Sequence, residues 1–249
     1  MLPPIFYCSP ESIDGDLITL SKDEAHHAKT VLRLKEHEQV VVIDGLGTAY
    51  RGTLNSSRGK KELTVSIQNI VRNFGEPFVK VTLAAGFSEG YRFDNVVQQG
   101  TEIGVSAFVP IITEKSKIKI GNQAKAAARI KRLERVALSA TKQCRRSCIP
   151  KLHSFVRFNE YLDSIDKSGL NLIFHPDSAG NNFNFKEPKN DVKAVTILVG
   201  PESGFSDNEI EKAINAGFRT VRMGPRWMRT ETAAPMACAL ILQYLGELS

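Results

Sequence analysis

The chain has 249 residues, of which 42% are hydrophobic and 24% charged, which is typical of a globular protein of one or two domains. This composition excludes disordered, fibrous and membrane classes. In particular, no window of the sequence approaches the roughly eighteen apolar residues that a helix needs to cross a bilayer. The start of the sequence lacks a basic segment followed by an apolar core, so we expect no signal peptide. The four cysteines form neither a disulfide framework nor a zinc pattern, so we expect a reducing, cytoplasmic location and no metal site.

The net charge of +6 is concentrated in one segment. Between Glu114 and Arg157 the sequence has thirteen Lys or Arg residues and only two acidic residues, so this segment carries +11 and the remainder −5. Such an asymmetry predicts a polyanionic partner.

The first seventy or so residues are predicted to form a small β-barrel. Asp-Gly pairs at 14–15 and 44–45 mark turns, and one helix begins at Ser21, which has the spacing of a capping box with Glu24. The expected strands are 5–8, 17–20, 39–43, 49–54 and 62–71.

The pattern changes after residue 73, so the predicted domains are 1–73 and 74–249. In the second domain strand-like runs alternate with helix-length segments, which favours an α/β fold with a parallel sheet covered on both faces. The expected strands are 79–85, 107–112, 170–174, 195–199 and 220–223, and the expected helices are about 93–103, 123–148, 206–216 and a last helix ending near 245.

The helix expected over 123–148 is amphipathic. Its apolar arc carries Ile130, Leu133, Ala137, Ala140, Cys144 and Cys148, and its opposite arc carries Lys125, Arg129, Lys131, Arg132, Arg135, Lys142 and Arg146. A charged helix face is usually no more than solvated. Here Glu134 is the only acidic residue among the cations, so their repulsion is unrelieved without an anionic partner, and the pattern predicts nucleic-acid contact.

Three loops that follow predicted strands have sequences suited to a ligand site. The first is Val199-Gly-Pro-Glu-Ser-Gly-Phe-Ser-Asp-Asn-Glu209, in which glycines allow the backbone to approach a ligand closely. The second, Met223-Gly-Pro-Arg-Trp-Met-Arg-Thr-Glu-Thr-Ala-Ala234, holds the only tryptophan and several charges, and the third is Phe174-His-Pro-Asp-Ser178. A tight βα turn explains the first loop equally well, and His175 alone is typical of a structural residue. Loops of this kind at one sheet edge favour a site.

The first two loops resemble the C-terminal signature of the RsmE-type small-subunit rRNA methyltransferases of the SPOUT superfamily. Segments at 26–34, 101–105, 110–116 and 143–147 agree with the same family in the same order, so the resemblance covers nearly the whole chain. It implies an N-terminal PUA-like β-barrel that positions RNA, and a SPOUT-type α/β domain with a parallel sheet and a C-terminal trefoil knot. It also implies a homodimer, S-adenosyl-L-methionine as methyl donor, and N3 methylation of a uridine in the decoding region of 16S rRNA, as naked RNA or in the 30S subunit. No membrane partner is implied.

The resemblance also implies site residues by position. The cofactor-binding residues would be Leu172, Phe174, His175, Val199, Gly200, Pro201, Glu202, Gly204, Met223, Gly224, Met228, Thr230 and Ala233. Among the catalytic residues, Arg229 would stabilise negative charge on the uracil carbonyls, and Glu202 or Glu231 would accept the proton or orient Arg229. RNA-binding residues would be His26, Lys29, Arg33, Lys125, Arg129, Arg132, Arg135, Arg146 and Arg226. For the histidine pair at 26–27, a solvated helix start is the alternative.

The chain departs from the family pattern at several positions. Ser203 replaces a usual glycine, Gln99 and Glu89 replace usual lysines, and Pro176 follows His175 where glutamate is common. A serine at 203 would be strained if that position requires positive φ. Three other functions stay open: a SPOUT methyltransferase that acts on another RNA atom, a non-catalytic RNA-binding ribosome-assembly factor, and a nucleotide-dependent enzyme of flavodoxin-like fold. The last lacks any phosphate-binding loop.

Overall fold

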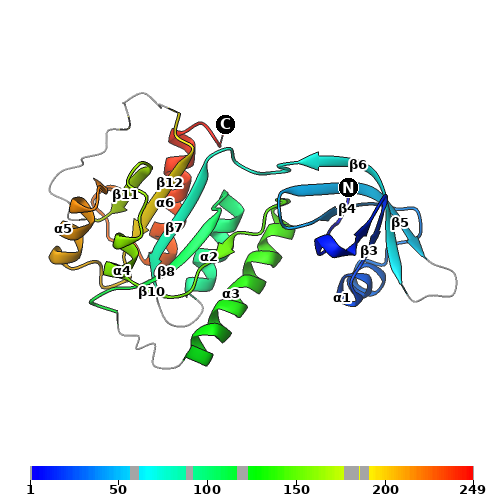
Figure 1. Cartoon of the computed structure of the whole chain (residues 1–249), viewed down its shortest axis with the longest axis horizontal. Coiled ribbons are helices and arrows are strands. Elements are labelled where there is room, and N and C mark those ends of the chain that lie inside the picture. The colour runs from blue at the N-terminus through cyan, green and yellow to red at the C-terminus, as the bar shows by residue number, and fades with distance from the viewer. Residues whose placement is uncertain are drawn as a thin grey trace. The chain divides into compact units, whose positions relative to one another are not determined.

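The computed structural model describes residues 2–56, 62–87, 92–116, 123–176, 185 and 191–248 (Figure 1). The chain divides into two compact units, Met1–Glu76 with Thr141–Ile149, and Pro77–Ala140 with Pro150–Ser249. The prediction divided the chain once, between residues 73 and 74. In the structure the chain passes between the units three times, because the segment 141–149 packs with the first unit.

The first unit is built on a six-stranded sheet in the order β1-β4-β5-β6-β3-β2. All neighbouring strands are antiparallel except β1 and β4, which are parallel. The strands are β1 (Ile5–Tyr7), β2 (Ile13–Asp14), β3 (Leu17–Thr19), β4 (Gln39–Ile43), β5 (Thr48–Ser56) and β6 (Leu63–Arg72). Every strand predicted for this region is therefore present, and β2 is the additional one.

A short helical segment covers this sheet. It comprises α1 (Lys22–His26) and one π-helical stretch, η2 (His27–Val31), and a 3₁₀ turn, η1 (Pro10–Ser12), precedes it. Ser21 caps α1 as predicted, since its Oγ accepts a hydrogen bond from the Glu24 N–H at 3.2 Å. Ala25 and Ala28 pack into a core with Phe6 because small side chains let the helix approach the sheet.

The second unit contains a seven-stranded sheet in which every pairing is parallel, as predicted. Its order is β10-β8-β7-β12-β11-β13, with β9 beside β8. The strands are β7 (Lys80–Gly86), β8 (Ala107–Ile112), β9 (Lys151–Leu152), β10 (Val156–Arg157), β11 (Leu170–Phe174), β12 (Ala194–Val199) and β13 (Arg219–Val221). The chain runs from β7 to one side through β8 and returns to the other side through β11 to β13. Open α/β sheets bind ligands at such a switch point, outside the carboxyl ends of the strands.

Helices cover both faces of this sheet (Figure 1). They are α2 (Arg92–Ile103), α3 (Gln123–Gln143), α4 (Phe158–Asp163), α5 (Asp207–Asn215) and α6 (Thr230–Tyr244). On one face α4 and α5 close a core with Ala84, Ile173 and Leu198. On the other face α2 packs against α6, and α6 contacts β7 and β12. Among the described helices none is long and apolar enough to cross a membrane.

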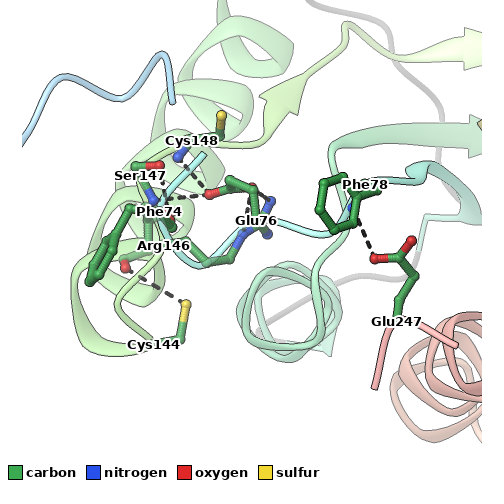
Figure 2. Close-up of polar contacts among 9 residues, drawn as sticks. Phe74, Glu76, Phe78, Cys144, Arg146, Ser147, Cys148 and Glu247 are labelled. Atoms are coloured by element: carbon green, nitrogen blue, oxygen red, sulfur yellow. Dashed lines mark hydrogen bonds and ion pairs between the residues drawn. The ribbon is translucent and has the colours of Figure 1, made fainter. Parts of the chain in front are cut away.

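The end of α3 differs from the prediction. The helix ends at Gln143 rather than Cys148, because Arg145 has a left-handed φ of 64°. Arg146 therefore does not continue the basic helix face; it is 3% exposed and its Nη2 lies 2.7 Å from Glu76 Oε2. The Glu76 carboxylate also accepts hydrogen bonds from the backbone N–H groups of Ser147 and Cys148, with donor–acceptor distances of 2.9 and 2.8 Å (Figure 2). The prediction that Arg146 lies on an exposed RNA-binding face is wrong, since it is the buried counter-ion of Glu76.

Candidate functional site

One pocket lies at the carboxyl ends of β11, β12 and β13. Strand register explains its position, because Phe174 pairs with both Val199 and Val221, so the three following loops leave the sheet at one level. The pocket is open to solvent, and its roughly 580 Å³ of empty space includes part of that solvent.

The pocket brings together the three loops that the sequence singles out. Of the thirteen predicted cofactor-binding residues, all but Leu172 line it. Leu172 is fully buried within β11 and contributes to the sheet instead. Four lining residues were not assigned to the cofactor: Pro176, Phe205, Arg226 and Trp227.

Glycines shape the middle loop of the pocket. A Cβ at Gly200 would lie 3.2 Å from both Gly204 C and Phe205 N, so the loop folds back tightly on itself. Gly204 has a φ of +68°, which glycine adopts without strain. Gly86, at the end of β7, packs directly against the backbone of the middle loop. A Cβ at this position would lie 2.2 Å from Pro201 N, so only glycine allows this close contact. Gly86 was not among the predicted site residues; the signal that could have indicated it is a glycine at the end of an apolar strand.

The middle loop is also tied to the loop after β8. Ser203 does not have positive φ, and its Oγ donates a hydrogen bond to the Lys115 carbonyl at 3.3 Å, so the serine introduces no backbone strain. Lys115 Nζ in turn donates to the Phe205 carbonyl at 2.9 Å. The buried Glu209 carboxylate accepts from the Glu114 and Ser206 N–H groups, and Ser206 with Glu209 forms the predicted capping box of α5.

Glu114 completes this connection. Its carboxylate accepts hydrogen bonds from Ser206 Oγ at 2.6 Å and Asn208 Nδ2 at 2.9 Å. These two bonds lower the pKa of Glu114 below its usual value, because they stabilise the charged form. The network therefore fixes the loop at the start of α5 as well as at its turn.

The last loop is anchored to the middle one. Thr230 is 2% exposed and its Oγ1 donates to the Gly200 carbonyl at 3.0 Å. Gly224 has a φ of +76°, and Arg222 Nε donates to its carbonyl at 3.3 Å. The segment between Gly224 and Thr230 is consequently held at both ends.

The three predicted catalytic residues occupy different environments. Glu202 lines the pocket and forms an exposed ion pair with Arg92 at the start of α2. Arg229 is exposed at the N-cap of α6, between the lining residues Met228 and Thr230. Glu231 is not part of the lining; it lies in the first turn of α6, and its Oε2 is buried without a hydrogen-bond partner. No sequence signal indicated Arg92, because its partner lies 110 positions away.

The basic face of α3 is less uniform than predicted. Lys125, Arg129 and Arg135 are exposed, but Arg132 pairs with Asp94 of α2. The Arg129 guanidinium lies 5.6 Å from the ring centroid of Phe87. The cations on this face are thus partly stabilised by their own protein.

In the first unit, the predicted RNA-binding residues His26, Lys29 and Arg33 are all exposed. His26 Nδ1 lies 3.3 Å from Thr30 Oγ1, and Arg33 follows the helical segment with a left-handed φ of 53° rather than extending it. Glu89, Asp177 and Ser178, and the cations Lys117 and Lys119 of the basic segment 114–157, lie outside the described residues. Within the described residues, no group of three or more His, Cys, Asp or Glu side chains could hold a metal ion.

Comparison with known families and proteins gives consistent matches over both units. The model of an RNA methyltransferase domain matches residues 75–242, and that of an RNA methyltransferase PUA domain matches residues 20–68. The ribosomal RNA small subunit methyltransferase E of Synechocystis sp. is 30% identical over 94% of this chain and 75% of its own length. The protein of the same name from Buchnera aphidicola of Acyrthosiphon pisum is 28% identical over 92% of this chain and 88% of its own.

Solved structures agree with these matches. A ribosomal RNA small subunit methyltransferase E from Neisseria gonorrhoeae, bound to S-adenosyl methionine, has a TM-score of 0.85 and 28% identity, covering 97% of this chain and 98% of that one. A methyltransferase from Legionella pneumophila in complex with the same cofactor has a TM-score of 0.83 and 30% identity, covering 98% of both chains.

Proposed function

Because the chain belongs to the ribosomal RNA small subunit methyltransferase E family, we propose that it transfers a methyl group from S-adenosyl-L-methionine to N3 of a uridine in the decoding region of 16S rRNA. One observation carries the proposal. The pocket at the carboxyl ends of β11 to β13 gathers twelve of the thirteen residues that the family resemblance assigns to the cofactor. A non-catalytic assembly factor has no use for such a pocket. Ser203, one of the departures from the family pattern that leave this alternative open together with Gln99 and Glu89, has no positive φ and so carries no backbone strain.

The pocket fits S-adenosylmethionine. Gly200 and Gly204 keep their backbone close to the cavity with no side chain in between, and Met223 and Met228 offer polarizable apolar surface. When bound, the cofactor supplies a methyl group on a positively charged sulfur, which passes to N3 of uridine as the carbon–sulfur bond breaks. The protein has to hold the nucleophile in line and exclude water.

Charge stabilisation is the main task of the catalytic residues. Uridine N3 carries a proton, and its loss to water leaves negative charge on the two neighbouring carbonyl oxygens. Arg229, exposed beside the pocket lining, stabilises that charge, which is usually the largest single catalytic contribution. Glu202 is held by Arg92, and this pairing favours a role in positioning over proton abstraction. Glu231, in the first turn of α6 two positions after Arg229, is assigned the other supporting role, as proton acceptor or as positioning residue for Arg229.

Substitution of Arg229 tests this assignment. Arg229→Ala is expected to lower turnover by roughly 10²–10³-fold and to leave the affinity for S-adenosylmethionine unchanged. Arg226→Ala, in the same loop, is the matched variant and should mainly raise KM for RNA, since Arg226 is assigned to RNA binding and not to charge stabilisation. Undiminished turnover in Arg229→Ala contradicts the assignment.

The reaction itself is tested by its product. Mass spectrometry of nucleosides from methylated 16S rRNA is expected to give N3-methyluridine. Another methylated nucleoside would indicate a different target atom. If calorimetry detects no binding of S-adenosylmethionine, the protein is instead a non-catalytic factor.

The remaining proposals concern RNA binding, the topology of the chain and its oligomeric state. The RNA-binding residues retained after the exclusion of Arg146 are His26, Lys29, Arg33, Lys125, Arg129, Arg132, Arg135 and Arg226; all are exposed except Arg132, which is partly exposed and pairs with Asp94. The segment 222–229 leads from β13, at the edge of the sheet, back to α6, which packs against β7 and β12. This path is compatible with a C-terminal trefoil knot.

Met236 and Leu240 of α6 are 49% and 36% exposed, which favours a homodimer through this helix. The first unit would act as a PUA-like barrel, and the protein would act in the cytoplasm.

A further inference from the structure

Trp227 is the only tryptophan of the chain, and it is 66% exposed although it lines the pocket. The phenylalanines of the same pocket behave differently, since Phe174 is 5% and Phe205 2% exposed. A large aromatic side chain normally contributes to stability by burying about 150–250 Å². Because most of the Trp227 side chain is exposed, it gains little of this stabilisation, and packing within the folded chain does not explain a tryptophan at this position.

The backbone around Trp227 is anchored. Thr230 is bonded to the Gly200 carbonyl, and Gly224 receives the Arg222 side chain. Pro225, between Gly224 and Trp227, has its φ fixed by the pyrrolidine ring. The ring is therefore carried by a short segment of limited conformational freedom, and little entropy is lost when something binds to it.

Cations flank the ring in the sequence and remain in solvent. Arg226 precedes Trp227 and lines the pocket, Arg229 follows two residues later, and both are exposed. Proteins that bind single-stranded RNA combine aromatic rings, on which bases stack, with basic side chains that contact the backbone.

We propose that Trp227 is the platform on which the uracil to be methylated stacks at the mouth of the cofactor pocket. The inference rests on the proposed function and extends it to the recognition of the target base. N3 lies on the pairing edge of uracil, so the base has to leave its helix before reaction, and a new stacking partner offsets part of the stacking that it loses. Because every base has a π-face, Trp227 contributes affinity and orientation rather than discrimination among bases.

Fluorescence tests the contact directly, because all tryptophan emission of the protein comes from this one residue. The probes are a decamer of uridine and a decamer of dihydrouridine, which has the same phosphates but a non-planar base that stacks poorly. At low salt, and with binding measured independently by anisotropy, the uridine decamer is expected to quench the emission and the dihydrouridine decamer to quench it far less. Equal quenching, or no quenching by bound uridine decamer, overturns the proposal.

Kinetics with two matched variants test the function of the contact. Trp227→Leu keeps an apolar side chain without a ring, and Trp227→Phe keeps a smaller ring. With small subunits from cells that lack this protein, Trp227→Leu is expected to lower kcat/KM for RNA about tenfold or more, as the loss of one stacked base implies. Trp227→Phe should stay within about threefold of wild type, and the Kd for S-adenosylmethionine should be unchanged in both.

The alternatives give separate results. A tenfold weaker Kd for S-adenosylmethionine with unchanged RNA affinity assigns the ring to the cofactor, and a shifted monomer–dimer equilibrium in sedimentation assigns it to a second copy of the chain; either overturns the proposal. A wild-type protein that methylates no RNA refutes the proposed function instead, and the fluorescence experiment then still decides whether Trp227 stacks on uracil.

Discussion

The Glu76–Arg146 pair allows a quantitative prediction about stability (Figure 2). Both side chains are nearly inaccessible, at 2% and 3% exposure. Glu76 accepts four hydrogen bonds: from Arg146 Nε and Nη2 at 3.2 and 2.7 Å, and from two backbone N–H groups at 2.9 and 2.8 Å. Glu76→Gln preserves the shape and volume of the side chain, so no cavity forms. It removes the charge, however, and turns one acceptor oxygen into an NH2 group that faces donors.

Breaking a buried pair at one partner typically costs about 3–5 kcal/mol, because the other charge stays buried without compensation. Glutamine retains one acceptor oxygen, so we expect the lower end, about 3 kcal/mol, in the free energy of unfolding. For a chain of this size each kcal/mol corresponds to about 2–4 °C, hence a fall in Tm of roughly 6–12 °C.

Urea unfolding followed by circular dichroism measures this loss. Glu62→Gln, at an exposed position of the same unit, is the control and should change stability by less than about 0.5 kcal/mol. Adding Arg146→Met to Glu76→Gln should restore part of the stability, since the unpaired charge is then removed. A loss below about 1 kcal/mol in Glu76→Gln would show that water reaches the pair and would refute the reasoning.

Three further predictions concern the pocket, the basic helix and alkaline stability. Gly86→Ala is expected to weaken S-adenosylmethionine binding at least tenfold in calorimetry, because its Cβ would lie 2.2 Å from the backbone nitrogen of Pro201, which cannot rotate away. Replacing Lys125 and Arg129 of α3 by glutamine should reduce the slope of log Kd for RNA against log salt by about 0.7 for each phosphate contact that is lost, as measured by filter binding. Burial raises the pKa of the Cys8 thiol from 9.0 to about 12, so above about pH 9 the unfolded chain loses this proton and the folded chain keeps it. Stability should therefore fall as the pH rises from about 9 to 12, and less so in Cys8→Ala.

Each of these predictions has its own control. Gly169→Ala should keep cofactor affinity, since its Cβ would approach no atom closer than 3.7 Å; equal affinity in Gly86→Ala would contradict the packing argument. Lys193→Gln, an exposed cation outside α3, should leave the salt slope unchanged. Urea midpoints that fall equally in Cys8→Ala and wild type between about pH 8 and pH 10.5 would contradict the role of Cys8.

The strands were the most predictable part of the fold. The bounds of β4, β8 and β11 match the expected ranges, because runs of buried apolar residues between turn signals specify them locally. The two-residue strands β9 and β10 and the six-residue helix α4 are too short for any periodic pattern. The end of α3 depended on the left-handed conformation of Arg145, and arginine has no intrinsic preference for that region.

The pocket was predictable to the extent that it consists of loops at strand ends. In a parallel sheet those ends meet at one edge, so the motifs at 199–205 and 223–233 could be placed together without coordinates. Contacts between distant segments were not accessible in this way. Gly86 behind Pro201 and Arg92 beside Glu202 depend on how β7 and α2 lie against the middle loop, which no local pattern specifies.

Part of the positive charge that the sequence concentrates in one segment is neutralised in the folded protein. The segment from 114 to 157 carries +11 by composition, but three of its cations are neutralised by acids from outside it: Lys142 by Glu24, Arg132 by Asp94 and Arg146 by Glu76. A cation that is paired in the folded protein releases no counterion from RNA unless its own pair is broken. The salt dependence of RNA binding should therefore report a smaller number of phosphate contacts than the composition suggests, drawn mainly from exposed residues such as Arg129 and Arg135.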